Sequence, residues 1–102
     1  MSTKETVAIL GGTGDLGTGL AIRWSKAGYK IVIGSRTQEK ADEAVAALKE
    51  LSPDTPAEAM ENGAAAKAGD IVVLTVPAAH QISTLDAVKD DLKGKILIDV
   101  TV

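Results

Sequence analysis

The chain alternates short apolar runs with segments of helical periodicity, and this alternation constrains the fold more than any other feature of the sequence. Short, mostly β-branched runs suit strands that are buried on both faces of a sheet, and they occupy Thr6–Leu10, Lys30–Gly34 and Ile71–Val76. The C-terminal segment "KILIDVTV" predicts a last strand of the same kind. Apolar residues between these runs recur every three or four positions, which predicts amphipathic helices.

The predicted helices are bounded by recognisable capping signals. The first begins at Asp15 and stops at Gly28, a residue suited to a helix C-terminus. Ser35 and Gln38 fit a capping box, which predicts that they open the second helix. A third helical stripe follows the run that ends at Val76 and stops at Gly94.

Residues 53–69 are harder to interpret, because Pro56 and Gly63 interrupt an alanine-rich stretch. They predict a short strand near 57–60 and a helical turn after Gly63. Alternating strands and helices joined by right-handed crossovers form a doubly wound parallel sheet, an α/β fold with three layers. The length of 102 residues suits a single domain, 1–102.

A cluster of glycines joins the first predicted strand to the first predicted helix. Gly12, Gly14 and Gly17 form the pattern G-x-G-x-x-G in the setting that a dinucleotide-binding fingerprint requires. We expect Gly12 to make the tight turn, Gly14 to let a pyrophosphate reach the backbone, and Gly17 to let the helix pack closely on the sheet. The helix N-terminus would present N–H groups to the phosphates. The alternative is that the glycines only shape a turn.

The remaining residues of this loop are assigned to the cofactor as part of the fingerprint. Thr13 has two possible partners, the cofactor and the loop itself. Leu16 belongs to the apolar face of the helix and lies within the fingerprint. The simplest role of Asp15 is helix N-capping, because a carboxylate beside a pyrophosphate is repelled unless it points away.

The end of the second predicted strand favours NADP over NAD. NAD-binding versions of this fold carry an acidic residue there, whereas "IVIGSRTQEK" offers Ser35 and Arg36. Arg36 can donate two parallel hydrogen bonds to a phosphate or stack on adenine. Thr37 adds a hydroxyl, and Lys40 adds a positive charge one turn along the helix. The alternatives are a capping role for Ser35 and a solvated surface role for Lys40.

The segments "GGTGDLGTGLA", "VIGSRTQEKA" and "IVVLTVPAAH" together resemble the N-terminal half of the F420-dependent NADP reductases, which are archaeal and actinobacterial enzymes. The resemblance implies a Rossmann-like domain that binds the 2′-phosphate of NADP through Ser35, Arg36 and Lys40. A second basic residue after the arginine is common in that family, and this chain has Thr37 there. The implied activity is reversible hydride transfer between reduced coenzyme F420, a deazaflavin, and NADP.

The resemblance also implies a larger assembly. Members of the family continue beyond the position of Val102 into a further strand and a smaller helical domain that holds the deazaflavin, and full-length members are expected to be homodimers. We therefore expect this chain to be the NADP-binding domain, without the deazaflavin and dimerisation domain.

Four residues at or after the end of the fourth predicted strand are candidates for contact with the nicotinamide half of NADP. In the resembled family this loop lies beside the nicotinamide ribose, which assigns Thr75, Val76, Pro77 and His80 to the cofactor site. His80 has an alternative surface or capping role. No catalytic residue is expected, because both hydride carriers are cofactors and the transfer needs no obligatory protein acid or base. A single histidine without cysteines predicts no metal site.

Composition removes several other classes of function. A net charge of −3 provides no general attraction to nucleic acids or anionic membranes, and the absence of cysteine excludes disulfides and thiol catalysis. With no long apolar segment near the N-terminus, the chain is predicted to be cytoplasmic. Competing hypotheses are a non-catalytic NADP-binding or sensing module, the cofactor half of another NADP-dependent reductase acting on a small imine or ketone, and a coenzyme A or FAD binder.

Overall fold

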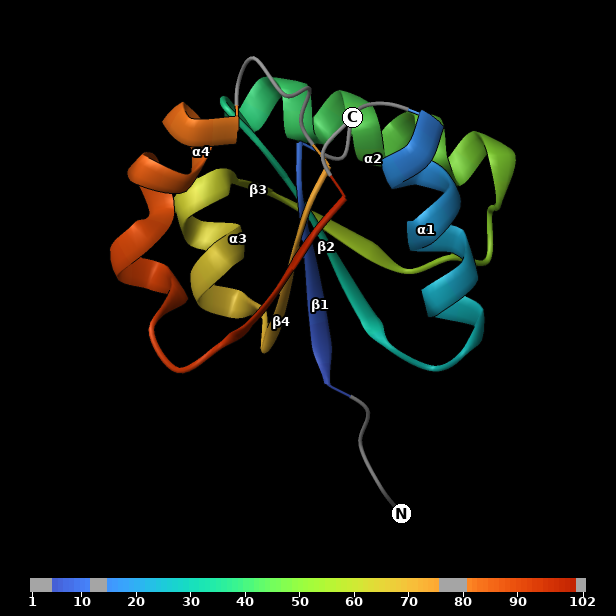
Figure 1. The fold of residues 1–102 in the computed structure, drawn as a ribbon. Helices are drawn as coiled ribbons and strands as arrows, with labels where there is room; N and C mark the ends of the chain where they lie inside the picture. The colour runs from blue at the N-terminus through green and yellow to red at the C-terminus, as the bar shows by residue number, and fades with distance from the viewer. Residues whose placement is uncertain (1–4, 12–14, 76–80, 101–102) are drawn as a thin grey trace.

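The chain folds around one parallel sheet with the strand order β3-β2-β1-β4-β5 (Figure 1). The structure, a computed structural model, describes residues 5–11, 15–75 and 81–100. The strands are β1 (Thr6–Leu10), β2 (Lys30–Ser35), β3 (Ala57–Glu61), β4 (Ile71–Leu74) and β5 (Ile96–Asp99). Each neighbouring pair runs parallel, as the predicted doubly wound fold requires.

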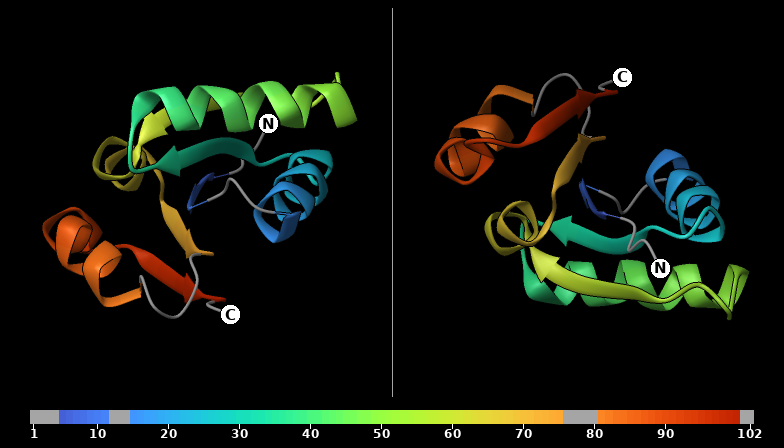
Figure 2. Two further views of the ribbon diagram at one scale, coloured as in Figure 1. Left: turned by 90° about the horizontal axis from the view of Figure 1, so that it is seen from above. Right: turned by 90° about the horizontal axis from the view of Figure 1, so that it is seen from below.

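Helices cover both faces of this sheet. They are α1 (Asp15–Lys26), α2 (Gln38–Leu51), α3 (Asn62–Ala68) and α4 (Gln81–Val88), the last continued by a 3₁₀ turn, η2 (Lys89–Leu92). Seen along the strands, α1 and α2 lie on one face while α3 and α4 lie on the other (Figure 2). The three-layer Rossmann-like architecture predicted from the alternating pattern is confirmed.

The core has two halves because successive side chains of a strand point to opposite faces. Val7 and Ile9 of β1 pack beneath α1 and α2 with Ile31, Ile33 and Leu48. The alternate residues of the same strand pack toward α3 and α4, in a cluster formed by Ala8, Leu10, Val32, Ala65, Ala66, Val72, Leu74 and Val88. The central strand is therefore buried on both sides, which accounts for its continuous apolar run.

The predicted start of the second helix was wrong. Ser35 is the last residue of β2, where it pairs with Glu61 of β3, so the chain is still extended at the position predicted to cap the helix. The N-cap is Thr37, whose backbone is extended and whose Oγ1 accepts a hydrogen bond of 3.2 Å from the N–H of Lys40. Gln38 instead donates from Nε2 to the carbonyl of Ala59 at 2.8 Å, which ties α2 to β3.

The strand and the helical turn predicted within residues 53–69 are both present, whereas the predicted helix that ends at Gly94 is confirmed only in part. The strand expected near 57–60 is β3, and the turn expected after Gly63 is the short helix α3. The stripe that ends at Gly94 divides into α4 and η2. Its first apolar residue, Ile82, is 74% exposed, so this face of α4 is not buried along its whole length.

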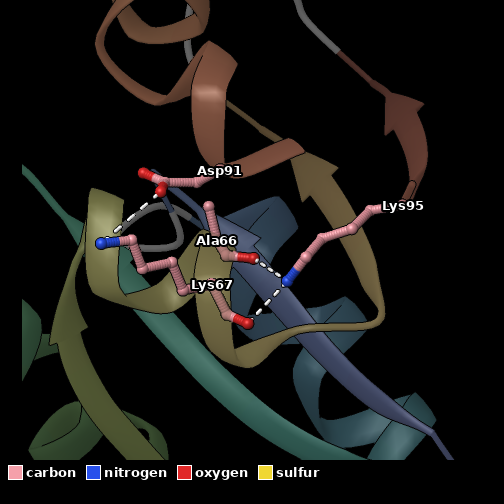
Figure 3. A network of polar contacts seen from close by, with 4 residues as sticks. All are labelled: Ala66, Lys67, Asp91 and Lys95. Atoms are coloured by element: carbon pink, nitrogen blue, oxygen red, sulfur yellow. Dashed lines mark hydrogen bonds and ion pairs between the residues drawn. The ribbon is translucent and has the colours of Figure 1, made fainter. Parts of the chain in front are cut away.

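A lysine closes the carboxyl end of α3. The Lys95 ammonium donates to the carbonyl oxygens of Ala66, Lys67 and Gly69, each at 2.6 Å (Figure 3 shows the first two). These carbonyls belong to the last turn of the helix and to its C-cap, which have no partners within the helix itself. On the same helix, Lys67 Nζ lies 3.7 Å from Oδ1 of Asp91 in η2. Both contacts fix the last turn of α3, the helix that starts at the carboxyl edge of the sheet after β3.

The β5 edge of the sheet exposes apolar side chains. Ile96, Leu97 and Ile98 are 59%, 41% and 39% exposed, although the matching positions of β4 are largely buried. Within the described residues, no helix combines the length and apolar character that crossing a bilayer would need.

Candidate functional site

The carboxyl ends of β1 and β4 form the switch point of the sheet. After β1 the chain passes to α1 on one face, and after β4 it passes to α4 on the other (Figures 1 and 2). Thr75 ties the two strand ends together, because its N–H and its Oγ1 both donate to the carbonyl of Leu10 at 3.0 Å. Ligands of open α/β sheets bind in the crevice at such a point.

The backbone turns away from β1 at a glycine that the fingerprint did not single out. Gly11 has a φ of 73°, a left-handed conformation that other residues rarely adopt, and its N–H donates to the carbonyl of Gly34 at 2.9 Å. The turn predicted for Gly12 therefore already begins one residue earlier. The doubled glycine in "GGTG" was the available signal.

The structure describes the predicted phosphate loop only before Gly12 and from Asp15 onward. Gly12, Thr13 and Gly14 lie outside the described residues. Asp15 and Leu16 are the first two residues of α1, so the chain is already helical at the position proposed to cap it. Gly17 is buried within α1, as close packing of the helix requires.

Arg36 lies where a 2′-phosphate ligand was predicted. It is exposed directly after the carboxyl end of β2, and it lines a hollow of about 350 Å³. The other walls come from the end of β3, the start of α3 and one side of α4, through Glu61, Asn62, Gly63, Ser83, Thr84, Ala87 and Val88. A volume in this range suits part of a small-molecule ligand.

Of the other predicted phosphate ligands, Ser35 is buried and Lys40 is exposed like Arg36. Ser35 is only 5% exposed at the end of β2, whereas Lys40 is exposed in the first turn of α2. Thr37, between them, uses Oγ1 to cap α2 and keeps its own hydroxyl proton for donation. Of the predicted cationic groups, Arg36 and Lys40 both lie near the amino end of α2, where the helix dipole favours an anion.

The predicted nicotinamide-side residues are described only at Thr75. This residue is 8% exposed, and its hydroxyl donates to the carbonyl of Leu10, so its described contact joins two strand ends. Val76, Pro77 and His80 lie outside the described residues.

One polar residue of the hollow was missed by sequence reasoning. Asn62 begins α3, and its Oδ1 is buried without a hydrogen-bond partner. A Cβ placed on Gly34 would lie 2.9 Å from this oxygen and 2.9 Å from Ala65 Cβ and Leu10 Cδ2. The missing side chain at Gly34 therefore makes room for the Asn62 carboxamide. The sequence offered only an asparagine before a glycine, which is a common turn signal.

A second hollow of about 400 Å³ lies at the opposite edge of the sheet, between the carboxyl end of α1 and the loop before β3. Lys26, Tyr29, Asp54 and Thr55 are among its lining residues. Because ligands of this fold bind at the carboxyl edge, the hollow beside Arg36 is the candidate functional site.

Comparisons with known proteins identify a family that the chain resembles along nearly its whole length. The model of the family described as "NADP oxidoreductase coenzyme F420-dependent" matches residues 6–102. The F420-dependent NADP reductase of Methanocaldococcus jannaschii is 48% identical over 100 residues, a match that covers 94% of this chain and 44% of that protein. The chain therefore spans less than half the length of this relative.

Solved structures of related enzymes share the fold of this chain. A crystal structure from Arthrobacter sp. FB24, assigned as an F420-dependent NADP reductase, superimposes with a TM-score of 0.80 at 26% identity, covering 95% of this chain and 44% of that one. An imine reductase from Aspergillus terreus, solved with NADPH4 and dibenz[c,e]azepine, has a TM-score of 0.70 at 26% identity and is covered over 33% of its length.

Proposed function

Because this chain belongs to the coenzyme F420-dependent NADP oxidoreductase family, we propose that it forms the NADP-binding part of an enzyme that transfers hydride between reduced coenzyme F420 and NADP. Its relatives from Methanocaldococcus jannaschii and Methanothermobacter thermautotrophicus are F420-dependent NADP reductases, which supports this activity. Since the chain spans 44% of the Methanocaldococcus relative, the part assigned to it is nucleotide binding.

The observation that carries the proposal is the position of Arg36. It is an exposed guanidinium beyond the carboxyl end of β2, on the rim of a hollow that reaches α4. A guanidinium offers paired N–H donors in the geometry of phosphate oxygens, and the amino end of α2 adds a favourable dipole. These groups suit the 2′-phosphate that distinguishes NADP from NAD.

NADP, when bound, supplies the nicotinamide ring that accepts or releases the hydride. The described residues of this chain provide the frame that holds it. Thr75 joins the ends of β1 and β4, and Gly11 turns the backbone away from β1, so both residues shape the chain at the switch point of the sheet. Positioning two rings at contact distance is the main task of a protein in such a transfer.

Calorimetric titration of the chain with NADP and with NAD tests this function. We expect NADP to bind more tightly than NAD, and Arg36→Ala to remove most of that preference by weakening NADP alone. The loss should be about 1.5–3 kcal/mol, or roughly 10- to 150-fold in Kd, which is the range for hydrogen bonds to a charged group.

Arg23→Ala is the matched control, because it removes the same charge from an exposed position in the last turn of α1. It should leave both affinities unchanged. Equal weakening of NADP and NAD by Arg36→Ala would contradict a 2′-phosphate role, and preference of the wild-type chain for NAD would refute NADP binding.

The proposal extends to partners and location. NADP and a deazaflavin are its small-molecule partners, the full-length protein is a homodimer, and it works in the cytoplasm without binding nucleic acid or membrane. The absence of cysteine and the net charge of −3 support this setting. Turnover of reduced F420 with NADP by the longest native form distinguishes an enzyme from a non-catalytic NADP-binding module, which would bind NADP without turnover.

A further inference from the structure

The edge of the sheet at β5 is apolar and uncovered. In the part of the chain that the structure describes, β5 pairs only with β4, so it ends the sheet on the side opposite β3 (Figure 2). Ile96, Leu97 and Ile98 are 59%, 41% and 39% exposed. Soluble proteins commonly place a charge, a proline or a bulge within such a strand, because its outward N–H and C=O groups pair readily with another strand. The centre of β5 has three consecutive apolar residues instead.

The hydrogen bonds of β5 show which of its backbone groups face outward. The N–H groups of Ile96 and Val100 donate to the carbonyls of Asp70 and Leu74, at 3.4 and 3.0 Å. In a parallel pair, alternate residues of a strand turn their N–H and C=O groups toward the same neighbour. The even-numbered residues of β5 therefore face β4. Leu97 lies between them, so its N–H and C=O point to the open edge.

We propose that β5 pairs with β5 of a second copy of this chain, antiparallel and about a twofold axis that passes between the two Leu97 residues. Antiparallel strands related in this way exchange two hydrogen bonds between the same residue of each copy. Each Leu97 N–H would donate to the Leu97 carbonyl of the other copy, and the two sheets would become continuous. This inference is independent of the proposed function, because none of the described residues that line the hollow beside Arg36 belongs to β5.

The side chains are complementary in this register. With Leu97 opposite Leu97, Ile96 of each copy lies opposite Ile98 of the other, and Lys95 lies opposite Asp99. Directly opposite side chains of antiparallel strands interact, so apolar pairs and opposite charges stabilise the pairing. A shift of two residues in either direction would instead place Leu97 opposite a charged residue. The charges that flank the apolar centre of β5 therefore favour one register.

Lys95 takes part through its charge. Its ammonium donates to carbonyls at the carboxyl end of α3, and the pairing of the strands leaves these bonds in place. Asp99 of the second copy would therefore lie near a fixed positive charge. In a parallel arrangement of two β5 strands, in contrast, residues of the same sign would lie near each other at both ends.

A small apolar hollow extends the surface on the α1 side of the sheet. It measures about 140 Å³, and its walls are Val7, Trp24, Tyr29, Ile71 and Ile98. Because Ile96 of the second copy would lie opposite Ile98, it would add apolar surface beside this hollow. The twofold axis repeats the contact, so each copy covers the exposed isoleucines of the other and removes them from water.

Sedimentation equilibrium of the 102-residue chain over a roughly hundredfold range of concentration tests the pairing. We expect a reversible monomer–dimer equilibrium. Leu97→Lys and Leu97→Glu should each weaken the dimer by roughly tenfold or more, because each substitution places two like charges opposite one another at the axis. An equal mixture of these two variants should restore the dimer to within about threefold of wild type, since opposite charges then meet at the axis.

Leu51→Lys is the matched control, because it makes the same substitution at a leucine that is 71% exposed at the end of α2. It should leave the equilibrium unchanged. Circular dichroism of each variant at low concentration establishes that the monomer is folded. If a charge at position 97 unfolds the chain, Ile96→Lys gives a second measurement at a position that is 59% exposed, and it should weaken the same dimer.

Each outcome decides the inference. Dimers that are lost in both single variants at position 97 and regained in their mixture support it. A wild-type chain that stays monomeric at every concentration overturns it and leaves the edge to a strand of a different partner or of a longer form. Dimers that survive Leu97→Lys, or that the mixture does not restore, also overturn it. NADP titration of the same samples reports on the proposed function separately, because binding of the nucleotide does not depend on this edge.

Discussion

Replacing Lys95 by methionine tests whether one ammonium holds the carboxyl end of α3 in place. The substitution keeps the aliphatic stem and removes the ammonium that donates to the carbonyls of Ala66, Lys67 and Gly69 at 2.6 Å (Figure 3 shows the first two). Those carbonyls would then lack a protein donor. The bond to Lys67 is exposed, whereas the other two are partly buried and are less accessible to replacement by water.

The expected destabilisation is about 2–3 kcal/mol. A hydrogen bond from a charged group contributes about 1.5–3 kcal/mol, and a cation at a helix C-terminus adds about 0.3–1 kcal/mol. The three bonds do not add in full, because they share one ammonium and water can solvate the exposed carbonyl. Since a domain of this size has about 5–15 kcal/mol of stability, the loss should lower the unfolding midpoint by roughly 10–20 °C.

Urea unfolding followed by far-ultraviolet circular dichroism measures the effect. Lys93→Met is the matched control, because Lys93 is exposed two residues earlier in the chain, at the C-cap of η2. It should change the free energy of unfolding by less than about 0.5 kcal/mol. If Lys95→Met unfolds as the control does, the capping contact contributes nothing and the reasoning fails.

Substitutions at three further positions test the packing and capping of the helices around the sheet. Gly69→Ala should destabilise by about 3 kcal/mol in urea unfolding, because its Cβ would lie 2.6 Å from Ala8 Cβ, in the centre of the sheet. Gly19→Ala should instead stabilise by about 0.5–1 kcal/mol, since Gly19 is exposed in α1 with nothing within 4 Å of an added Cβ, and the opposite order would contradict the geometry. Thr37→Ala should cost about 1 kcal/mol of stability by removing the cap on Lys40 N–H, whereas Thr37→Ser should restore most of it.

Strand and helix positions were predictable because they follow from local patterns. Continuous apolar runs identify strands buried on both faces, and β1, β2 and β4 appear where these runs lie. The start of α2 was not predictable in the same way. Ser35 and Thr37 both have side chains that can cap a helix, and the pairing of Ser35 with Glu61 of a distant strand selected Thr37.

The candidate site shows the same division. The sequence shows that the end of β2 lacks an acidic residue and carries Arg36. These two features predict a phosphate ligand without knowledge of the tertiary structure. Asn62 was not predictable, because its importance depends on an unpaired oxygen that lies against Gly34, 28 positions earlier in the chain.

By itself, then, the sequence determined the alternation of strands and helices, the glycine-rich turn after β1 and the cationic end of β2, because each depends on residues that are neighbours in the chain. The tertiary structure decided which residue caps α2, how Lys95 closes α3, and which groups enclose the hollow beside Arg36. These features join segments from β2, β3, α3 and α4, and their side chains meet only after the sheet has ordered its strands.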